Sequence, residues 1–573
     1  MCGIAGIAGN VDDSLVYAMT SRLQHRGPDG AGFLQSAGIA LGHRRLAILD
    51  LTSSGAQPMR SRDGRFAIAF NGEIFNYREL RSELGGPFVS SGDTEVLVEA
   101  CAAWGIERTL ERINGMFAFA LWDEVEEVLT LARDRSGEKP LVYFWDGTTF
   151  AFASEIKALS ELHSSRLDPA AVDAYLALGY VPAPLAIFRD CRKVPGGHFL
   201  QYRAGQIEIR RWWFPEKACV RARVPTDDEG ELRKRVSDAV RLRLRADVPV
   251  ALCLSGGIDS SVIAAECACH NAPVEAVTVA LDGDETDLAY ARIAARHLGL
   301  LHHVIRFNSK SISRQIEEAM RRFDEPFADS SALPTVALAE ALSSTHKVVV
   351  TGDGGDEAFG GYPHYEYVGA KQALKRTAAA AGLCDGSGRS GVYVQSKALF
   401  RLHERTRLLG PHAPGRTFSE FLEADAFLPH ASGSSLRRAL WHDRHLHLPN
   451  DLTFKMDIAL GAFGMEARAP FLDHRVLEWA QNLEPRDLVR GGQKKVLLRR
   501  AYRGRLPDAV LDRPKHGFGS PIGTWLPGPL KSTVAHCLPC PLLEAAPQLR
   551  ARGQRLWTLL TFALWAKTWG AKW

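Results

Sequence analysis

From Glu231 onward the sequence alternates short apolar runs with segments of helical spacing, and this alternation constrains the fold more than any other feature. The runs that indicate buried strands lie at residues 248–254, 274–281, 303–307 and 347–351. Helical spacing begins at Ser260 and recurs over residues 287–298. Strands that alternate with helices build a parallel sheet with helices on both faces. We therefore expect an α/β unit over residues 231–573.

The first 210 residues follow a different pattern, with many short strand-like runs bounded by Gly, Asp and Asn. These runs lie at residues 38–51, 65–70, 116–122, 128–132 and 150–153. Several alternate apolar with polar or small residues, which is typical of half-buried antiparallel strands. Helical spacing over residues 94–104 indicates that helices cover the sheets. We expect stacked β-sheets over residues 1–210 and a polar linker over 211–230.

Length and charge exclude several classes of protein. A chain of 573 residues is expected to form two to four structural units. Lys and Arg number 70 against 66 for Asp and Glu, a net charge of +4 without a long basic block, so we expect no nucleic-acid partner. The start of the chain lacks the pattern of a secretory signal, and the longest apolar runs, such as residues 556–566, are too short to span a bilayer. We expect a cytoplasmic protein without a membrane span.

Three local patterns resemble known sites but lack the context that those sites need. Cys537 and Cys540 form a single CxxC without a second pair, which favours neither zinc nor redox chemistry. Residues 386–391 fit GxGxxG but follow an Ala-rich helical run instead of a strand, so we expect no dinucleotide site. Histidines at positions 442, 445 and 447 lack HExxH spacing, and a surface or packing role is expected for them.

Cys2 is the first residue that suggests catalysis. If Met1 is removed, the thiol and the free α-amine belong to one residue, and an α-amine with a pKa of about 7.7–8.0 can act as general base for its own thiol. Taken alone, Cys2 is also compatible with an ordinary position in a buried N-terminal strand.

Asn71 and Gly72 supply a second element of the same chemistry. An Asn amide beside an unhindered Gly N–H provides two donors where a tetrahedral oxyanion develops. Asn-Gly also favours a hairpin turn, which is the structural alternative. The neighbouring segments HRGPDG (25–30), HRRL (43–46) and SGDTE (91–95) contribute an Arg and an Asp suited to the carboxylate and ammonium of a free amino acid.

The segment SGGIDSS at residues 255–261 follows an apolar strand directly. Glycines and serines between a strand and a helix let backbone N–H groups and hydroxyls approach a phosphate. No Gly-Lys-Ser/Thr follows, so this is not a Walker A loop, and SGGxDS resembles the pyrophosphate-binding loop of ATP pyrophosphatases. Asp259 is placed to hold Mg²⁺.

A second loop, TGDGGDE at residues 351–357, follows the strand expected at 347–351. Ligands of parallel sheets bind at the carboxyl ends of the strands, so we expect the two loops to share one crevice. Acidic side chains there suit Mg²⁺ binding and proton transfer, although a solvated acidic turn has the same composition. Lys494 and Lys495 further along the chain provide positive charge for a phosphate.

In combination and order, these motifs resemble those of glutamine-hydrolysing asparagine synthetases, whose N-terminal domain is the glutaminase of class II glutamine amidotransferases. The resemblance runs from Cys2 to the Leu556-Trp557 segment. It implies an N-terminal αββα Ntn-hydrolase sandwich and a C-terminal α/β ATP-pyrophosphatase domain. It also implies conversion of aspartate to asparagine with glutamine, ATP and Mg²⁺, through an acyl-adenylate that ammonia from an internal channel attacks.

The same resemblance assigns roles to individual residues. Cys2 would be the nucleophile, with Asn71 and Gly72 as oxyanion hole and Arg45 on the glutamine carboxylate. The implied glutamine pocket comprises Arg45, Leu46, Ala47, Ile48, Leu49, Asn71, Gly72, Glu73 and Asp93. The implied ATP site comprises Leu254, Ser255, Gly256, Gly257, Asp259, Ser260, Val279, Thr351, Gly352 and Lys495, with Asp259 and Asp356 on Mg²⁺. Asp353 stands where some members have a catalytic Glu, so its reach is one methylene shorter.

The identity of the acceptor stays open at this point, because no residue that would select the α-groups of aspartate is evident. Relatives of this architecture amidate other carboxylates, such as uronic acids of sugars, or close peptide and β-lactam rings. The ring-closing alternative is disfavoured because Cys2, Asn71, Gly72 and Asp93 are all present. A catalytically silent interaction protein is disfavoured because both motif sets are retained. Family members often dimerise through the N-terminal domain, and a homodimer is the expected partner.

Overall fold

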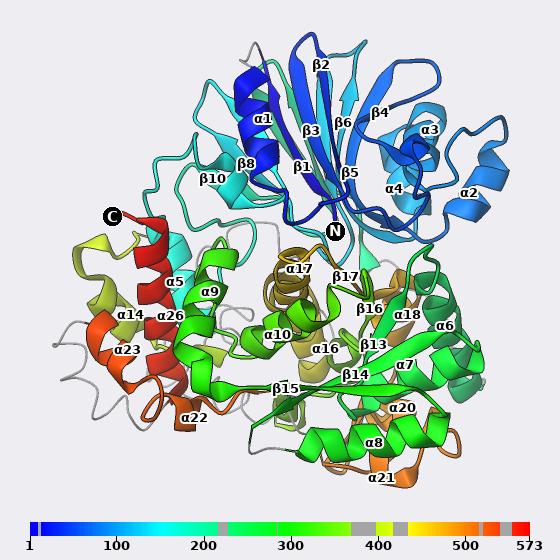
Figure 1. Cartoon of the computed structure of the whole chain (residues 1–573), viewed down its shortest axis with the longest axis vertical. Helices are drawn as coiled ribbons and strands as arrows, with labels where there is room; N and C mark the ends of the chain where they lie inside the picture. Colours follow the sequence, from blue (N-terminus) through cyan, green and yellow to red (C-terminus); the bar gives the residue numbers. More distant parts are fainter. Residues whose placement is uncertain are drawn as a thin grey trace.

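The computed structural model describes the whole chain except residues 10–12, 216–226, 283–284, 368–396, 416–433, 515–518 and 539–552. Two units lie one above the other, and the N-terminus is at the boundary between them (Figure 1). Residues 386–391, with the GxGxxG pattern, and Cys540 of the CxxC pattern lie outside the described residues.

The N-terminal unit contains two antiparallel sheets of six strands each. The first sheet has the order β10 (Cys191–Lys193), β8 (Val142–Trp145), β9 (Phe150–Ala153), β1 (Gly3–Ala8), β3 (Ile39–Arg45) and β2 (Gly30–Ser36). The second has the order β12 (Gln206–Arg211), β11 (His198–Arg203), β7 (Val128–Arg133), β6 (Gly115–Asp123), β5 (Phe66–Ile74) and β4 (Met59–Arg60). Side chains of both sheets share one buried cluster that includes Ile4, Leu41 and Ala118. The sheets therefore stack face to face, as the alternating runs of the sequence predict.

Helices cover the outer faces of this sandwich. Helix α1 (Asp13–Ser21) packs against β1 and β3, and α3 (Thr94–Trp104) packs against β5 (Figure 1). Shorter helices α2 (Tyr77–Leu84) and α4 (Ile106–Arg112) pack beside α3. The resulting αββα arrangement agrees with the predicted one.

The C-terminal unit is built on a parallel sheet of five strands. Their order is β15 (His302–Phe307), β14 (Val274–Leu281), β13 (Val250–Cys253), β16 (Val348–Val350) and β17 (Glu466–Arg468), and every neighbouring pair is parallel. The strand order reverses between β13 and β16, which creates a crevice outside their carboxyl ends. Both loops singled out in the sequence begin at this crevice.

Helices cover both faces of the parallel sheet, as expected for such sheets. One face is covered by α6 (Asp228–Arg243), α7 (Ile258–Cys269), α8 (Thr286–Leu298), α18 (His474–Ala480) and α20 (Val496–Ala501). The other is covered by α9 (Ile312–Arg322), α10 (Ala332–Leu342), α17 (Thr453–Gly461) and α26 (Gly553–Trp569). Beyond these lie α5 (Pro169–Leu178), α14 (Leu402–Leu409), α16 (Ser435–His442) and the π-helical segment η7 (Asp443–Leu452).

Two local expectations differ from the structure. The strand expected over residues 38–51 ends at Arg45, because the backbone beyond it turns and pairs with Asp247 of the other unit, whose N–H donates to Ile48 O at 2.9 Å. The hairpin alternative for Asn71-Gly72 is wrong, since both residues lie inside β5.

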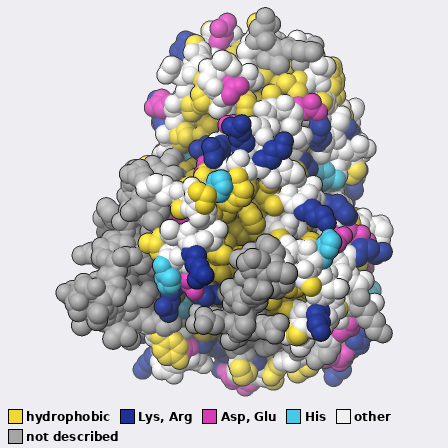
Figure 2. Space-filling view, turned by 90° about the vertical axis from the view of Figure 1, so that its left-hand side faces the viewer, with side chains coloured by type: hydrophobic (Ala, Val, Ile, Leu, Met, Phe, Trp, Pro, Cys, Tyr) yellow, Lys and Arg dark blue, Asp and Glu magenta, His cyan; other side chains and the backbone are white. Residues whose placement is uncertain are grey.

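Among the described residues, no helix combines the length and hydropathy that crossing a bilayer requires. The apolar run near the C-terminus forms α26, and its Trp557 and Trp565 are buried against the core. Figure 2 shows hydrophobic side chains gathered in the middle of one face, with Lys and Arg side chains above and beside them.

Candidate active sites

The first candidate site is a cavity at the start of β1, on the boundary between the two units. Cys2 lies there with its sulfur 3.4 Å from the backbone N–H of Leu46, which donates to it. The predicted residues that line this cavity are Cys2, Arg45, Leu46, Ile48, Leu49, Gly72, Glu73 and Asp93. Two predicted residues lie outside the lining: Ala47, whose N–H donates to Asp29 at 2.8 Å, and Asn71.

Gly72 and Asn71, the two residues predicted as oxyanion hole, are both tightly enclosed in β5. The φ of Gly72 is +156°, and a Cβ at this position would lie 2.2 Å from the carbonyl oxygen of Met116 on β6. Only glycine therefore fits beside the neighbouring strand. The Asn71 side chain is fully buried, and neither its oxygen nor its nitrogen has a hydrogen-bond partner among the described residues. A buried amide without partners is costly unless a ligand completes it.

Arg45 and Asp93 provide opposite charges at the edge of the cavity. The Arg45 guanidinium donates to the carbonyl oxygens of Leu49 at 3.4 Å, Thr52 at 2.6 Å and Asp50, and so holds the loop that lines one wall. Asp93 is buried and accepts a hydrogen bond from Ile74 N–H at 2.8 Å. Burial raises the pKa of Asp93 to about 6.

Met1 blocks the chemistry predicted for Cys2 as long as it is present. Its side chain is buried, and its α-amine donates to Met465 O at 3.4 Å. Burial lowers the pKa of this amine to about 5 and raises the pKa of the Cys2 thiol. The nitrogen of Cys2 is then a peptide amide and cannot accept a proton. An N-terminal nucleophile therefore requires that Met1 be removed.

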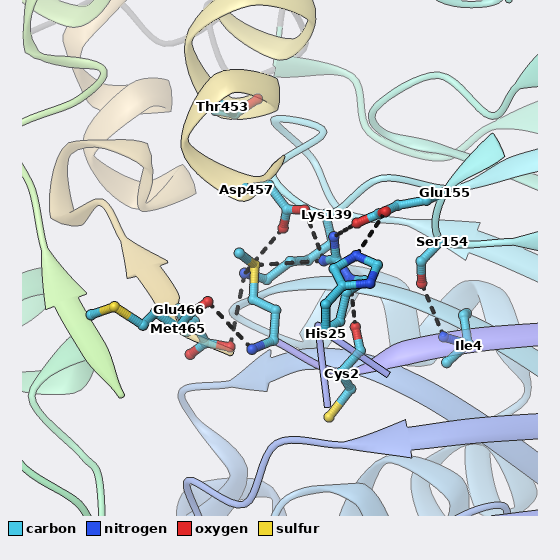
Figure 3. A network of polar contacts seen from close by, with 12 residues as sticks. Cys2, Ile4, His25, Lys139, Ser154, Glu155, Thr453, Asp457, Met465 and Glu466 are labelled. Atoms are coloured by element: carbon cyan, nitrogen blue, oxygen red, sulfur yellow. Dashed lines mark hydrogen bonds and ion pairs between the residues drawn. The ribbon is translucent and has the colours of Figure 1, made fainter. Parts of the chain in front are cut away.

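A charged cluster surrounds the position of Met1, between the two units. Lys139 Nζ lies 3.0 Å from Met1 Sδ, 3.7 Å from Asp457 of α17 and 3.8 Å from Glu466 of β17. Figure 3 shows Lys139, Asp457 and Glu466 in one network of polar contacts, with Cys2 at its lower edge. Arg26 extends the cluster, with ion pairs to Asp457 at 2.8 Å and Glu155 at 2.6 Å.

The second candidate site is a cavity of about 610 Å³ at the carboxyl ends of β13, β14 and β16. This volume is ordinary for a small-molecule site. Of the predicted residues, Leu254, Ser255, Gly257, Asp259, Ser260, Val279, Thr351, Gly352, Asp353, Asp356 and Lys495 line it, and Gly256 does not. The two loops therefore share one crevice, as the sequence predicts.

The Ser255 loop leads into the N-terminus of α7. Gly256 has a φ of +68°, and a Cβ there would lie 2.4 Å from the backbone nitrogen of Ala291 on α8. The Ser260 hydroxyl turns back to Gly257 O at 3.2 Å and lies 3.1 Å from the Ser255 hydroxyl. Hydroxyl and N–H groups at a helix N-terminus can bind phosphate.

Asp259 and Asp356 meet at one point of this cavity although they come from different loops. Both pair with the ammonium of Lys495, which precedes α20 in a left-handed conformation with φ +55°. Although burial opposes it, these two carboxylates raise the pKa of Lys495. Mg²⁺ needs only one or two carboxylates when phosphates complete its shell. The carboxylates of Asp259 and Asp356 are therefore suitable ligands for Mg²⁺, and the ammonium of Lys495 is suited to bind a phosphate.

Two further acids stand beside these carboxylates. Asp353 Oδ2 accepts a hydrogen bond from the Thr351 hydroxyl at 2.7 Å, and burial raises the pKa of Asp353. Glu357 is fully buried, accepts a hydrogen bond from Tyr362 at 2.5 Å, and has a pKa that burial raises to about 8.

The sequence reasoning missed a group of cavity residues that come from three distant segments: Asp329, His447, Asp451 and Lys455. Of the three predicted packing histidines, His447 thus faces the cavity, whereas His442 and His445 do not line it. One signal was available for Lys455, which is a charged residue in an otherwise mostly apolar helix, α17.

Arg468 is a second missed residue, and it links the two sites. Its guanidinium is fully buried and contacts Glu73 at 3.0 Å and Glu466 at 2.9 Å. Its backbone oxygen accepts a hydrogen bond from Thr351 N–H at 2.9 Å. Arg468 therefore contacts a residue of the Cys2 cavity and a residue of the large cavity at once.

Comparison with known proteins gives two family matches along the chain. A family described as "Glutamine amidotransferase domain" matches residues 1–213, and one described as "Asparagine synthase" matches residues 231–567. Asparagine synthetase [glutamine-hydrolyzing] 1 of Bacillus subtilis (strain 168) is 30% identical, over 99% of this chain and 96% of the relative. A putative asparagine synthetase [glutamine-hydrolyzing] of Mycobacterium bovis is 32% identical, over 99% and 97%.

Some more distant relatives and solved structures have other names. Amidase chry2 of Gibberella zeae is 28% identical over 90% of this chain and 86% of the relative. Among solved structures, glutamine phosphoribosylpyrophosphate amidotransferase from B. subtilis, complexed with ADP and GMP, has a TM-score of 0.30 and 19% identity, and covers 53% of this chain and 65% of its own.

The stacked sheets with a cysteine at the start of β1, joined to a parallel sheet with an ATP-pyrophosphatase loop, define a glutamine amidotransferase coupled to ATP-dependent amidation. The chain belongs to the family of glutamine-hydrolysing asparagine synthetases, and it is a glutamine-hydrolysing ligase.

Proposed function

We propose that this protein converts aspartate to asparagine with ammonia from glutamine and energy from ATP. The observation that carries the proposal is the presence in one chain of two cavities, one at Cys2 and one at the β13 and β16 loops, with Arg468 in contact with a residue of each. Family membership gives glutamine and ATP as the substrates, and the named relatives favour aspartate.

In the first cavity, the Cys2 thiolate attacks the side-chain amide carbon of glutamine. Asn71 and the Gly72 N–H stabilise the oxyanion. The α-amine of Cys2, which took the proton of the thiol, gives it to the amide nitrogen as the tetrahedral intermediate collapses, so ammonia leaves and a thioester remains. Water then hydrolyses the thioester to glutamate and restores the thiol. Asp93 binds the α-ammonium of glutamine. Arg45 holds the loop that lies at the carboxylate of glutamine.

In the second cavity, an oxygen of the aspartate side-chain carboxylate attacks the α-phosphorus of ATP, and the bond to the bridging oxygen breaks to release pyrophosphate. The Ser255 loop and Lys495 hold the phosphates, and Asp259 and Asp356 would hold Mg²⁺, which would supply positive charge against the phosphate oxygens. Ammonia then attacks the acyl carbon, AMP leaves, and Asp353 is placed to take the released proton.

Ammonia has to move from the Cys2 cavity to the large cavity, and residues near α17 lie between the two. Glu466 lines the Cys2 cavity, Asp457 lies in the charged cluster at Met1, and Lys455, two residues before Asp457 on α17, lines the large cavity. We propose that ammonia passes through the buried interface around α17, from the Cys2 cavity to the large cavity. Excluding water along this route protects the acyl-adenylate from hydrolysis.

The proposal is tested by incubating the purified protein with glutamine, ATP and Mg²⁺, with and without aspartate, and measuring glutamate, AMP, pyrophosphate and asparagine. We expect AMP and asparagine in equal amounts, both dependent on aspartate. The variant Cys2→Ala is expected to lose glutamine-dependent synthesis and keep ammonia-dependent synthesis. Glutamate without AMP or asparagine contradicts aspartate as the acceptor.

A second candidate is the same chemistry on a different carboxylate, such as a sugar uronate or a biosynthetic intermediate. The observations that favour it are the relatives named amidases, at 27% to 28% identity, and Asp353 in place of a longer acid. A screen of carboxylates for AMP release distinguishes the two candidates. Dimerisation through the N-terminal unit is proposed on the family resemblance and is tested by analytical ultracentrifugation.

A further inference from the structure

One side of the Cys2 cavity is formed by a segment that lies between the two units. Leu46, Ile48 and Leu49 line the cavity, and they belong to residues 46–50, which follow β3 and form neither helix nor strand. We call residues 46–50 the Leu46 loop. Its Leu46 N–H donates to the sulfur of Cys2 at 3.4 Å, so the direction of the loop backbone bears directly on the sulfur.

Apolar side chains keep the Leu46 loop at the boundary. Leu46 and Ile48 are buried, and both belong to an apolar cluster built mostly from the C-terminal unit, which includes Leu232 and Ala239 of α6. Apolar burial has no preferred direction, so it fixes the place of the loop more than the direction of its N–H and C=O groups. That direction depends on polar contacts.

Lys347 of the C-terminal unit makes the first of these contacts. The Ala47 N–H donates to Asp29 Oδ2 at 2.8 Å, and the same carboxylate oxygen accepts a hydrogen bond from Lys347 Nζ at 2.7 Å. Lys347 Nζ also donates to Ala47 O at 3.5 Å. Lys347 therefore contacts both the carbonyl of Ala47 and the carboxylate that holds the Ala47 N–H.

Asp247 of the C-terminal unit makes the second contact, further along the loop. Its backbone N–H donates to Ile48 O at 2.9 Å, and its carboxylate accepts a hydrogen bond from Asp50 N–H at 2.9 Å. From the N-terminal unit, Arg45 donates to the carbonyl oxygens of Leu49 and Asp50. The backbone of the Leu46 loop is thus held from both units at once.

The contact between Lys347 and Asp29 has little weight in the stability of the fold. Their side chains are 33% and 30% exposed, and solvent screens an ion pair of this kind. Lys347 precedes β16, whose backbone pairs with β13 on one side and β17 on the other, so the sheet does not depend on the Lys347 side chain. Removing the ammonium is therefore expected to act on the Leu46 loop and to leave the fold in place.

We propose that Lys347 and Asp247 are positioning residues for the Cys2 site, because they orient the backbone of the Leu46 loop so that the Leu46 N–H points at the Cys2 sulfur. An N–H donor favours the thiolate over the thiol, and the thiolate is the form that attacks glutamine. The inference rests on the proposed role of Cys2 as nucleophile. It makes the glutamine site depend on two residues outside the N-terminal unit.

The charges around the sulfur allow the effect of this hydrogen bond to be isolated. Burial raises the pKa of the Cys2 thiol, and the hydrogen bond from Leu46 opposes the rise. The terminal amine, Glu466 and Arg45 also act on the thiol by their charge. Substitutions at Lys347 and Asp247 leave all three groups unchanged, so a shift in the titration of Cys2 reports on the loop.

The first test measures glutamate release from glutamine by the full chain without ATP or acceptor, so that the result does not depend on which carboxylate is amidated. Lys347→Met loses the ammonium and Asp247→Ala loses the acceptor of the Asp50 N–H. We expect kcat/KM for glutamine to fall about 5-fold or more in each, the effect of one lost hydrogen bond. Lys347→Arg keeps a donor and Asp247→Asn keeps an acceptor, and both are expected to stay near the unmodified protein.

The second test measures alkylation of Cys2 by iodoacetamide as a function of pH, with mass spectrometry of the N-terminal peptide as readout. Because the thiolate is the form that reacts, the pH midpoint of alkylation follows the pKa of Cys2. We expect this midpoint to rise by about 0.5 unit or more in Lys347→Met and Asp247→Ala, and to stay unchanged in Lys347→Arg and Asp247→Asn. A merely structural role lowers the number of active chains without moving the midpoint.

Glu79→Gln is the matched control. Glu79 of α2 pairs with Arg245 of the C-terminal unit at 2.9 Å, so the substitution removes an ion pair between the two units away from the Leu46 loop. We expect this variant to match the unmodified protein in kcat/KM and in the alkylation midpoint. Equal effects in Glu79→Gln and Lys347→Met would mean that a general weakening of the interface is the cause, which overturns the inference.

The variant Cys2→Ala separates this inference from the proposed function. Glutamate release at the normal rate by Cys2→Ala contradicts Cys2 as the nucleophile, and the inference with it. If Cys2→Ala is inactive while folded Lys347→Met and Asp247→Ala chains, judged by thermal unfolding, keep the kcat/KM and the midpoint of the unmodified protein, Cys2 stands as nucleophile and the positioning role is wrong. A fall in activity without a shift of the midpoint also overturns the positioning role.

Discussion

Asp93 shows how a single buried residue links protonation to substrate binding. Its carboxylate accepts a hydrogen bond from Ile74 N–H, and the negative charge of Glu466 lies nearby. Because burial raises the pKa to about 6, the carboxylate is ionised above that pH and neutral below it. The folded protein disfavours the ionised form of Asp93, so its neutral form contributes stability at low pH. This contribution is lost as the pH rises from the pKa of Asp93 in the unfolded chain through its pKa of about 6 in the folded protein.

We therefore predict that kcat/KM for glutamine falls as pH drops below about 6, by about tenfold for each unit, since the neutral acid no longer attracts the α-ammonium. The rate of glutamate release between pH 5 and 8 measures this. The variant Asp93→Asn is expected to have a low kcat/KM for glutamine at every pH and no fall below pH 6. If kcat/KM of this variant still falls below pH 6, the protonated group is not Asp93.

Met1 gives a second residue-scale prediction. A short extension before Met1 prevents its removal, so the nitrogen of Cys2 stays an amide. We expect this chain to lose glutamine hydrolysis and to keep ammonia-dependent AMP release, while the same extension after Trp573, which is exposed, leaves both. Mass spectrometry of the unextended chain is expected to show that Met1 is absent. Glutamine hydrolysis at the normal rate by the extended chain contradicts the N-terminal base.

Among the elements, those with a strong local pattern could be predicted from the sequence. The run at residues 150–153 coincides with β9, and the helical spacing at 94–104 coincides with α3. The strand predicted at 38–51 extended too far because its last residues turn to contact Asp247, which is about 200 positions away. Local patterns do not encode such long-range contacts.

In the candidate sites, too, some residues could be predicted from the sequence and others could not. Residues of the Ser255 and Thr351 loops follow strands directly, and strand order then brings them together. Lys455, Asp451 and Asp329 have no common motif, because only the packing of α17, η7 and the segment before α10 places them side by side. Tertiary packing, which the sequence pattern does not show, determines that wall of the cavity.

The turn between β13 and α7 allows a prediction with a matched control. Alanine at Gly256 is strained by φ +68° and would place its Cβ 2.4 Å from Ala291 N. At Gly257, φ is −73° and the nearest atom is the Ser255 hydroxyl oxygen at 3.2 Å. We expect Gly256→Ala to lower the free energy of unfolding by about 2 kcal/mol or more, and Gly257→Ala by less than about 1 kcal/mol. Urea unfolding measures both, and equal losses contradict the steric argument.

At the scale of the whole molecule, the two units are joined by buried charges instead of an apolar seam alone. Asp457 of α17 pairs with Arg26 of the N-terminal unit, and Asp473 pairs with Arg243 at 3.0 Å and accepts a hydrogen bond from Asn114 at 2.9 Å. Buried ion pairs contribute little net stability but fix geometry, and breaking one is costly. Such an interface fixes the position of one cavity relative to the other.

Arg468 is the member of this interface that contacts both cavities. Through Glu73 it touches the glutamine side, and through its backbone oxygen it holds Thr351 on the nucleotide side. If occupation of one site affects the other, a displacement of Glu73 is transmitted to Thr351 through this one residue. The coupling is measured as the ratio of glutamate to AMP formed, and as the stimulation of glutamate release by ATP with aspartate.

We predict that Arg468→Lys keeps the charge but loses the forked contact with Glu73 and Glu466, so the ratio of glutamate to AMP rises about 5-fold or more. Arg475→Lys is the matched control, since Arg475 pairs with Asp473 at the same interface but is 37% exposed. The control is expected to keep the ratio of the unmodified protein. A lower unfolding midpoint in Arg468→Lys with an unchanged ratio would show that Arg468 supports the interface without coupling the sites.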